Sequence, residues 1–238
     1  MHSFHALTCQ VLQVGHTIPL PIPLHPQQIS GVFFRFFEIA AIALGSLGGV
    51  LALRRDHSSR YDIIGLLGLG LLSGVGGGLV RDIMLGDGPP LALLHPSYLA
   101  YALAGAAIAI LFGHTVGPRM LAFMNIVDAL ALAFFTTAGS TRALNAHLGF
   151  LPCLMLGVTT AVGGGALKDL FSGRTPATFQ EGELYALVAT FAAAAFLGLA
   201  RMGVPVNHAA SIGTTIGFVL RLLAIRYGWR TRAIGALS

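Results

Sequence analysis

Charged residues are scarce in this chain. Its 238 residues include 14 Lys and Arg and 9 Asp and Glu, so 10% of the residues are charged, whereas about 25% is usual in a soluble domain. So few charges cannot cover the surface of a soluble globule of this length, and hydrophobic residues make up 55% of the chain. These two fractions exclude a water-soluble protein and predict one polytopic membrane domain.

Cysteine is also rare, and basic residues form no patch. Two cysteines, Cys9 and Cys153, are too few for a disulfide framework, and we expect no structural disulfide. The formal net charge is +5, but the basic residues lie between apolar segments. That distribution is typical of a membrane protein and argues against nucleic acid as a partner. Glycine is abundant instead, with 31 residues, which suits closely packed or broken membrane helices.

The first 30 residues differ from the rest. They contain no Lys or Arg, and the run PLPIPLHP favours an extended backbone over a helix. A signal peptide would need a positively charged start and a longer apolar centre. We expect residues 1–30 to form a poorly ordered extension.

Seven apolar stretches of membrane-spanning length follow the extension. Each is about 20 residues long, as a hydrocarbon core of about 30 Å requires. The sequence therefore predicts an all-α polytopic membrane protein with seven transmembrane helices and short connections. The predicted spans are residues 32–53, 61–80, 91–112, 119–139, 149–168, 182–201 and 206–226.

The chain contains an internal repeat. Residues 73–90 and 160–176 share a glycine triplet, a basic–Asp pair, a glycine and a proline at an offset of about 87. The alignment pairs Gly76, Gly77, Gly78, Arg81, Asp82, Gly86 and Pro89 with Gly163, Gly164, Gly165, Lys168, Asp169, Gly173 and Pro176. Upstream, with a three-residue gap, Glu38 aligns with Asp128.

Spans 1–3 and 4–6 are then two copies of one three-helix unit. Because three is odd, the second copy enters the membrane from the opposite side, and such inverted repeats are typical of transport proteins. The predicted units are the extension at 1–30, the first repeat at 31–113, the second repeat at 114–203, a seventh helix at 204–228 and a basic tail at 229–238.

Both glycine triplets lie inside hydrophobic spans. Each glycine costs roughly 1 kcal/mol against Ala in a helix interior. We expect helix breaks at Gly76–Gly78 and Gly163–Gly165, where freed carbonyl oxygens would form a constriction and coordinate cations. The alternative is that the glycines only allow helices to pack closely.

Charged residues inside the spans need partners or water. A lone carboxylate at the membrane centre costs at least about 2.5–3.5 kcal/mol, so Glu38 and Asp128 should be neutralised or paired inside the bundle. Arg81 and Lys168, the basic residues of the two motifs, are natural partners, as are the neighbouring Asp82 and Asp169. The charged groups either line a hydrated path or form a structural ion-pair network; the two basic residues could also be interfacial anchors.

Hydroxyl groups near the triplets could also line a path, or could bond to the preceding helical turn. The candidates are Ser73, Thr159 and Thr160. The segment GVGGGLVRD lacks both the βαβ context and the following Gly-Lys-Ser/Thr of a phosphate-binding loop, and there is no nucleophile elbow. We therefore expect no enzyme and no cofactor.

Taken together, these features resemble a known family. The seven spans, the duplicated GGG-x-x-(R/K)-D motif and the acidic residue in spans 1 and 4 resemble the prokaryotic branch of the trimeric intracellular cation (TRIC) channels, over roughly residues 32–226. The resemblance implies a homotrimer in a prokaryotic plasma membrane, with a pore in each protomer that passes K⁺ and Na⁺ and is lined largely by kinked spans 2 and 5. Animal members associate the second-motif lysine with inositol lipids. Here Lys168 is followed by Asp169-Leu170 instead of Glu-Val, which argues against that lipid.

The sequence thus predicts a passive channel for monovalent cations. The triplets would form the constriction, Asp82 and Asp169 would supply negative charge, and the two basic residues would act as a barrier or gate. A secondary transporter for glycine or another small zwitterion is the alternative, with Glu38 or Asp128 holding an ammonium group or a coupling proton. A membrane scaffold that transports nothing is a third possibility.

The distribution of Lys and Arg also predicts an orientation. With the N-terminus outside, ten basic residues lie on the inner side and four on the outer side. Because basic residues are enriched on the cytoplasmic side, we expect the N-terminus outside and the C-terminus in the cytoplasm, with membrane lipids around the spans.

Overall fold

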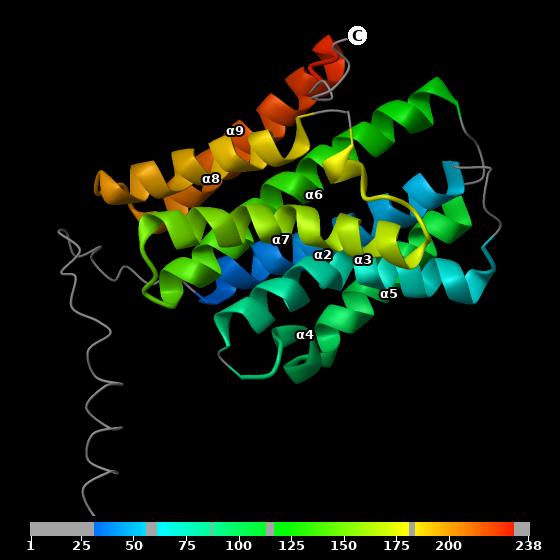
Figure 1. Ribbon diagram of the computed structural model, residues 1–238, viewed down its shortest axis with the longest axis horizontal. Coiled ribbons are helices and arrows are strands. Elements are labelled where there is room, and N and C mark those ends of the chain that lie inside the picture. Colours follow the sequence, from blue (N-terminus) through cyan, green and yellow to red (C-terminus); the bar gives the residue numbers. More distant parts are fainter. Residues whose placement is uncertain (1–30, 56–60, 87, 113–116, 181–183, 231–238) are drawn as a thin grey trace, which may run out of the picture.

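A computed structural model describes residues 31–55, 61–86, 88–112, 117–180 and 184–230. The extension predicted at 1–30 lies outside these residues, as does most of the tail predicted at 229–238. The elements within the described residues are eight α-helices, labelled α2 to α9, and one short 3₁₀-helix, η1 (Figure 1).

Within the described part of the chain, five helices are long and apolar enough to cross a membrane. They are α2 (Gly31–Arg55), α3 (Ile63–Leu85), α6 (Pro118–Asn145), α7 (Phe150–Phe171) and α9 (Val206–Tyr227). The helices α5 (Pro96–Phe112) and α8 (Tyr185–Arg201) have 17 residues each. The short α4 (Leu91–Leu94) precedes α5, and η1 (Ala177–Phe179) precedes α8.

Each predicted span coincides with a described helix, but the third span is divided. The predicted helix over 91–112 is interrupted between α4 and α5, where His95 has an extended backbone with φ −121° and ψ 94°. The reason is Pro96, which disfavours a helical conformation in the residue before it and begins α5. The sixth span begins at Tyr185 instead of 182.

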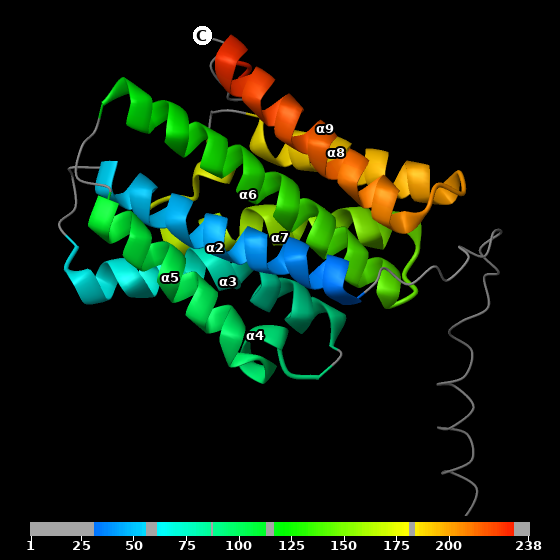
Figure 2. The same cartoon turned by 180° about the vertical axis from the view of Figure 1, so that it is seen from behind.

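The helices α3 and α7 lie along each other (Figure 1). The helix α2 packs against α3, α5 and α6, and α6 also packs against α7 and α9. Seen from both directions, α8 and α9 lie on one side of the bundle, and α4 and α5 lie on the opposite side (Figures 1 and 2).

The predicted breaks at the glycine triplets are wrong. The helix α3 continues through Gly76–Gly78, and α7 continues through Gly163–Gly165. Close packing of the two helices explains why glycines are needed there, so the alternative interpretation of the triplets is the one the structure supports.

The second glycine of each triplet is where the two backbones meet. A Cβ atom on Gly77 would collide with the carbonyl oxygen of Thr160, and one on Gly164 would collide with the carbonyl oxygen of Ser73. The third glycines are different, because a Cβ on Gly165 would meet nothing within 4 Å. The second glycine therefore fixes the helix crossing, whereas the third leaves open space beside the helix.

The last glycine of each motif ends its helix. Gly86 has φ +64° and Gly173 has φ +74°, in the left-handed region that residues with a Cβ rarely adopt. The N–H of Gly86 donates to the carbonyl of Asp82, which closes the last turn of α3. The motif thus contains its own helix terminator, and the charged pair lies in the last turns before it.

Candidate functional site

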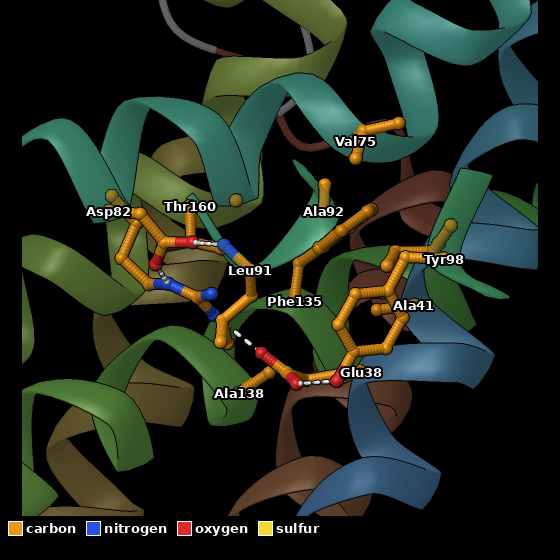
Figure 3. Close-up of a pocket in the computed structure, with 13 residues that line it drawn as sticks. Glu38, Ala41, Val75, Asp82, Leu91, Ala92, Tyr98, Phe135, Ala138 and Thr160 are labelled. Carbon is orange, nitrogen blue, oxygen red and sulfur yellow. Dashed lines mark hydrogen bonds and ion pairs between the residues drawn. The ribbon is translucent and has the colours of Figure 1, made fainter. Parts of the chain in front are cut away.

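The charges of the first motif lie in a small buried cavity beside α2, α3 and α5 (Figure 3). Arg81 on α3 donates from Nε to Asp82 Oδ1 at 2.8 Å, and its Nη1 lies 3.1 Å from Glu38 Oε1. The Tyr98 hydroxyl donates to Glu38 Oε2 at 2.6 Å. All four residues are buried. Glu38 is therefore paired inside the bundle, as predicted, and Arg81 is not an interfacial anchor.

The free volume of this first cavity is about 20 Å³, close to the minimum that holds one water molecule. Gly78 and Thr160 also line it. The cavity is therefore an ion-pair site with little spare room, and not a wide passage.

Each motif aspartate connects its helix to the element that follows. Asp82 Oδ2 accepts from the N–H of Leu91 at 2.9 Å, at the start of α4. Asp169 Oδ2 accepts from the N–H of Ala177 at 3.1 Å, at the start of η1. The residues directly before these two N–H groups are Pro90 and Pro176. Pro90 is therefore the structural counterpart of Pro176, whereas the sequence alignment paired Pro176 with Pro89.

The charges of the second motif line a larger cavity of about 240 Å³. Lys168 on α7 is buried and donates to its neighbour Asp169. Asp128 Oδ2 accepts from Nε of Arg221 at 3.0 Å and from its Nη2 at 2.9 Å. The expected pairing of the basic residue with the upstream acid is thus confirmed for the first motif. In the second motif Lys168 pairs with the other expected partner, Asp169, and Asp128 pairs with Arg221.

Arg221 is the functional candidate that the sequence prediction missed. It lies on α9, is buried, and its guanidinium carbon is 4.6 Å from the centre of the Tyr185 ring. A basic residue inside the apolar stretch 206–226 was the available signal, because buried charges in a span are expensive and need a partner.

Phe135 on α6 lies between the two cavities, since it lines both of them. The side chain is buried and its ring packs over Gly45 of α2, where a Cβ would come within 2.5 Å of Phe135 Cε2. One aromatic ring therefore forms part of the wall of a nearly filled cavity on one side and of a larger one on the other.

A solved structure decides the family. The chain is 31% identical to the structure described as the TRIC trimeric intracellular cation channel orthologue from Rhodobacter sphaeroides, with a TM-score of 0.74. The match covers 82% of this chain and 98% of that one. This chain belongs to the prokaryotic TRIC family. A second TRIC structure, from work on conductance through TRIC cation channels, matches with a TM-score of 0.75 at 24% identity and shows the same fold.

Further comparisons also relate this TRIC protein to membrane proteins. The family model described as "Glycine transporter" matches residues 35–114 and 125–201. A UPF0126 membrane protein of Deinococcus radiodurans is 35% identical over 158 residues, which are 66% of this chain and 71% of the relative. The UPF0126 inner membrane protein YadS of Escherichia coli K12 is 31% identical over 198 residues, 81% of this chain and 91% of the relative. This TRIC protein is thus an integral, multi-pass membrane protein.

The candidate hydroxyl residues differ in position. Ser73 lines the second cavity and donates to the carbonyl of Gly45 at 2.9 Å. Thr160 lines the first cavity and donates to the carbonyl of Leu156 at 2.6 Å. Thr159 is half-buried on α7 and is not among the residues that line either cavity. Two of the three predicted hydroxyls in this TRIC chain therefore reach a cavity, each with its hydrogen already bonded to a backbone carbonyl.

Proposed function

We propose that this TRIC-family protein is a channel for the monovalent cations K⁺ and Na⁺, with a pore inside each protomer of a homotrimer. The observation that carries the proposal is the pair of charged cavities in an apolar helix bundle, both of which are lined by Phe135. Buried charged groups are expensive in membrane spans and are typical of ion paths. The Rhodobacter relative, described as a trimeric cation channel, supports the same function.

The path we propose runs beside α3 and α7, from one cavity to the other. The third glycines, Gly78 and Gly165, line the first and second cavity respectively, so the helix backbone borders the path without being broken. The second glycines hold the two helices at one fixed distance. In this proposal the triplets shape the path by packing, and not by freed carbonyl groups.

The architecture we propose is an inverted repeat of residues 31–113 and 114–203, with the helix at 204–228 outside it. Corresponding residues support this arrangement, since Asp82 and Asp169 make the same bond to the next element. The Gly77 and Gly164 contacts are also reciprocal. The two cavities would then face opposite sides of the membrane, with the second one toward the cytoplasm and the N-terminus outside.

Phe135 is the closed barrier of the proposed path. An apolar constriction can stop ions by excluding water, so removal of the ring should join the cavities. We expect Phe135→Ala to raise K⁺ flux into liposomes. Phe134→Ala is the matched control, because Phe134 is the next residue of α6, packs against Phe36 and Phe37, and does not line either cavity.

Planar-bilayer recordings of the purified protein test the function itself. Unitary K⁺ currents that grow more frequent in Phe135→Ala support the channel. A folded wild-type protein without such currents contradicts the proposal, and so does a Phe135→Ala variant that behaves like Phe134→Ala.

A secondary transporter for glycine or another small zwitterion is the second candidate function. The second cavity supports it, because Lys168 and Arg221 face Asp128 and Asp169 there and the four formal charges cancel. The family model's description points the same way. Saturable glycine uptake with counterflow in liposomes, without unitary currents, would favour this candidate over the channel.

A further inference from the structure

We propose that Arg221 of α9 sets the net charge of the second cavity and thereby limits its preference for cations. This inference rests on the proposed channel function. It names a selectivity-determining residue that lies outside the duplicated motifs, on the helix that has no counterpart in the repeat.

The two cavities differ by one cation. The first contains Glu38, Asp82 and Arg81, with a formal charge of −1. Among the described residues, the second is lined by the corresponding acids Asp128 and Asp169 and by two cations, Lys168 and Arg221, so the formal charges of these four residues sum to 0. Arg221 is therefore the residue that brings the charge of these described lining groups from −1 to 0.

The contacts of Arg221 hold this positive charge in place. Two guanidinium nitrogens donate to one carboxylate oxygen of Asp128, and the guanidinium lies against the Tyr185 ring. The side chain of Arg221 is 6% exposed, whereas that of Asp128 is 38% exposed. A guanidinium stays charged at all physiological pH values, and stacking on an aromatic ring restricts its motion. The Asp128 carboxylate lines the second cavity, and its negative charge is already balanced by Arg221.

Loss of the Arg221 charge would change the local concentration of ions in the second cavity. A unit charge about 8 Å away, in a medium with an effective dielectric constant of about 30, changes the local concentration of a monovalent ion by about tenfold. Removing the positive charge should favour cations, and removing the negative charge of Asp128 should favour anions.

Three variants separate this charge effect from a purely structural ion pair. They are Arg221→Gln, Asp128→Asn and the double variant, which give the second cavity formal charges of −1, +1 and 0. Reversal potentials in a KCl gradient report the K⁺/Cl⁻ permeability ratio of each purified protein. We expect this ratio to rise by about tenfold in Arg221→Gln, to fall by a similar factor in Asp128→Asn, and to return near the wild-type value in the double variant. Arg221→Lys keeps the charge and should retain the wild-type ratio.

Opposite shifts in the single variants support the proposal. Equal ratios in all variants overturn it, and so does a change in the same direction in both single variants, which is what loss of a structural pair would produce. A wild-type protein without ion currents would refute the proposed function itself, so the two failures are distinguishable.

A second measurement avoids variants that leave an unpaired buried charge. Gly165 lines the second cavity and has open space around it, so Gly165→Cys can be labelled with a cationic or an anionic methanethiosulfonate reagent after the protein has folded. The anionic reagent should raise the K⁺/Cl⁻ ratio and the cationic one should lower it, with reagent-treated wild type as the control. Shifts of the same sign from both reagents would overturn the proposal.

Discussion

The helix crossing at the second glycines can be tested with pairs of neighbouring substitutions. Gly77→Ala places a Cβ against the carbonyl oxygen of Thr160, which belongs to the backbone of α7 and can move only if the helix moves. Gly78→Ala is the matched control, because its Cβ would meet only Arg81 Nη2 at 3.9 Å. Both changes add the same methyl group at adjacent positions of the same helix.

The expected difference in stability follows from two effects. Replacing Gly by Ala in a helix interior stabilises it by about 1 kcal/mol, and this gain applies to both variants. Overpacking costs about 1–3 kcal/mol, and it applies only to Gly77→Ala, toward the upper end because the clash is with backbone. The two variants should therefore differ by about 3 kcal/mol, or about 6–12 °C in Tm for a chain of this size.

Size-exclusion chromatography of heated, detergent-solubilised protein measures this difference. Gly78→Ala should survive to a slightly higher temperature than wild type, and Gly77→Ala should be lost well below it. Gly164→Ala should likewise be lost at a lower temperature than Gly165→Ala. A Cβ on Gly164 would collide with the carbonyl oxygen of Ser73, whereas a Cβ on Gly165 would meet nothing within 4 Å. Midpoints within about 2 °C of each other in both pairs would refute the backbone-to-backbone crossing.

Three further predictions concern polar contacts. Tyr98→Phe removes the bond to Glu38 and should lower stability by about 1.5–3 kcal/mol in the same heating assay, whereas Tyr101→Phe, exposed on the same helix, should have little effect. Lys168→Ala should change conductance or open probability more than trimer abundance in bilayer recordings and chromatography; normal currents from a depleted trimer would contradict this. Arg54→Ala removes bonds to two carbonyls in the last turn of α5 and should lower stability by about 1–2 kcal/mol, so an unchanged midpoint would argue against that cap.

Much of the fold was predictable because it depends on short-range patterns. Apolar stretches of about 20 residues are detectable in any chain, and each predicted span coincides with a helix. The repeated motif also identified the charged residues that now line two cavities. The exception is the span over 91–112, whose division at Pro96 follows from a local rule that could have been applied to the sequence.

The candidate site was predictable in its residues but not in its contacts. Three consecutive glycines are compatible with a broken helix or with a close crossing, and their helix propensity is the same in both cases. Only the position of α7 against α3 shows that the crossing is the correct choice. The partner of Asp128 was equally undetermined, because Arg221 is 93 residues away along the chain.

By itself, the sequence determined that this chain is a helical membrane protein of the TRIC family with charged residues in its apolar spans, because hydropathy and motif spacing are properties of the chain order. The tertiary structure alone decided that α3 and α7 remain continuous and touch at the second glycines. It also decided that Arg221 pairs with Asp128 in the second cavity and that Phe135 lines both cavities. These features depend on distances between helices far apart in the chain, and packing sets those distances.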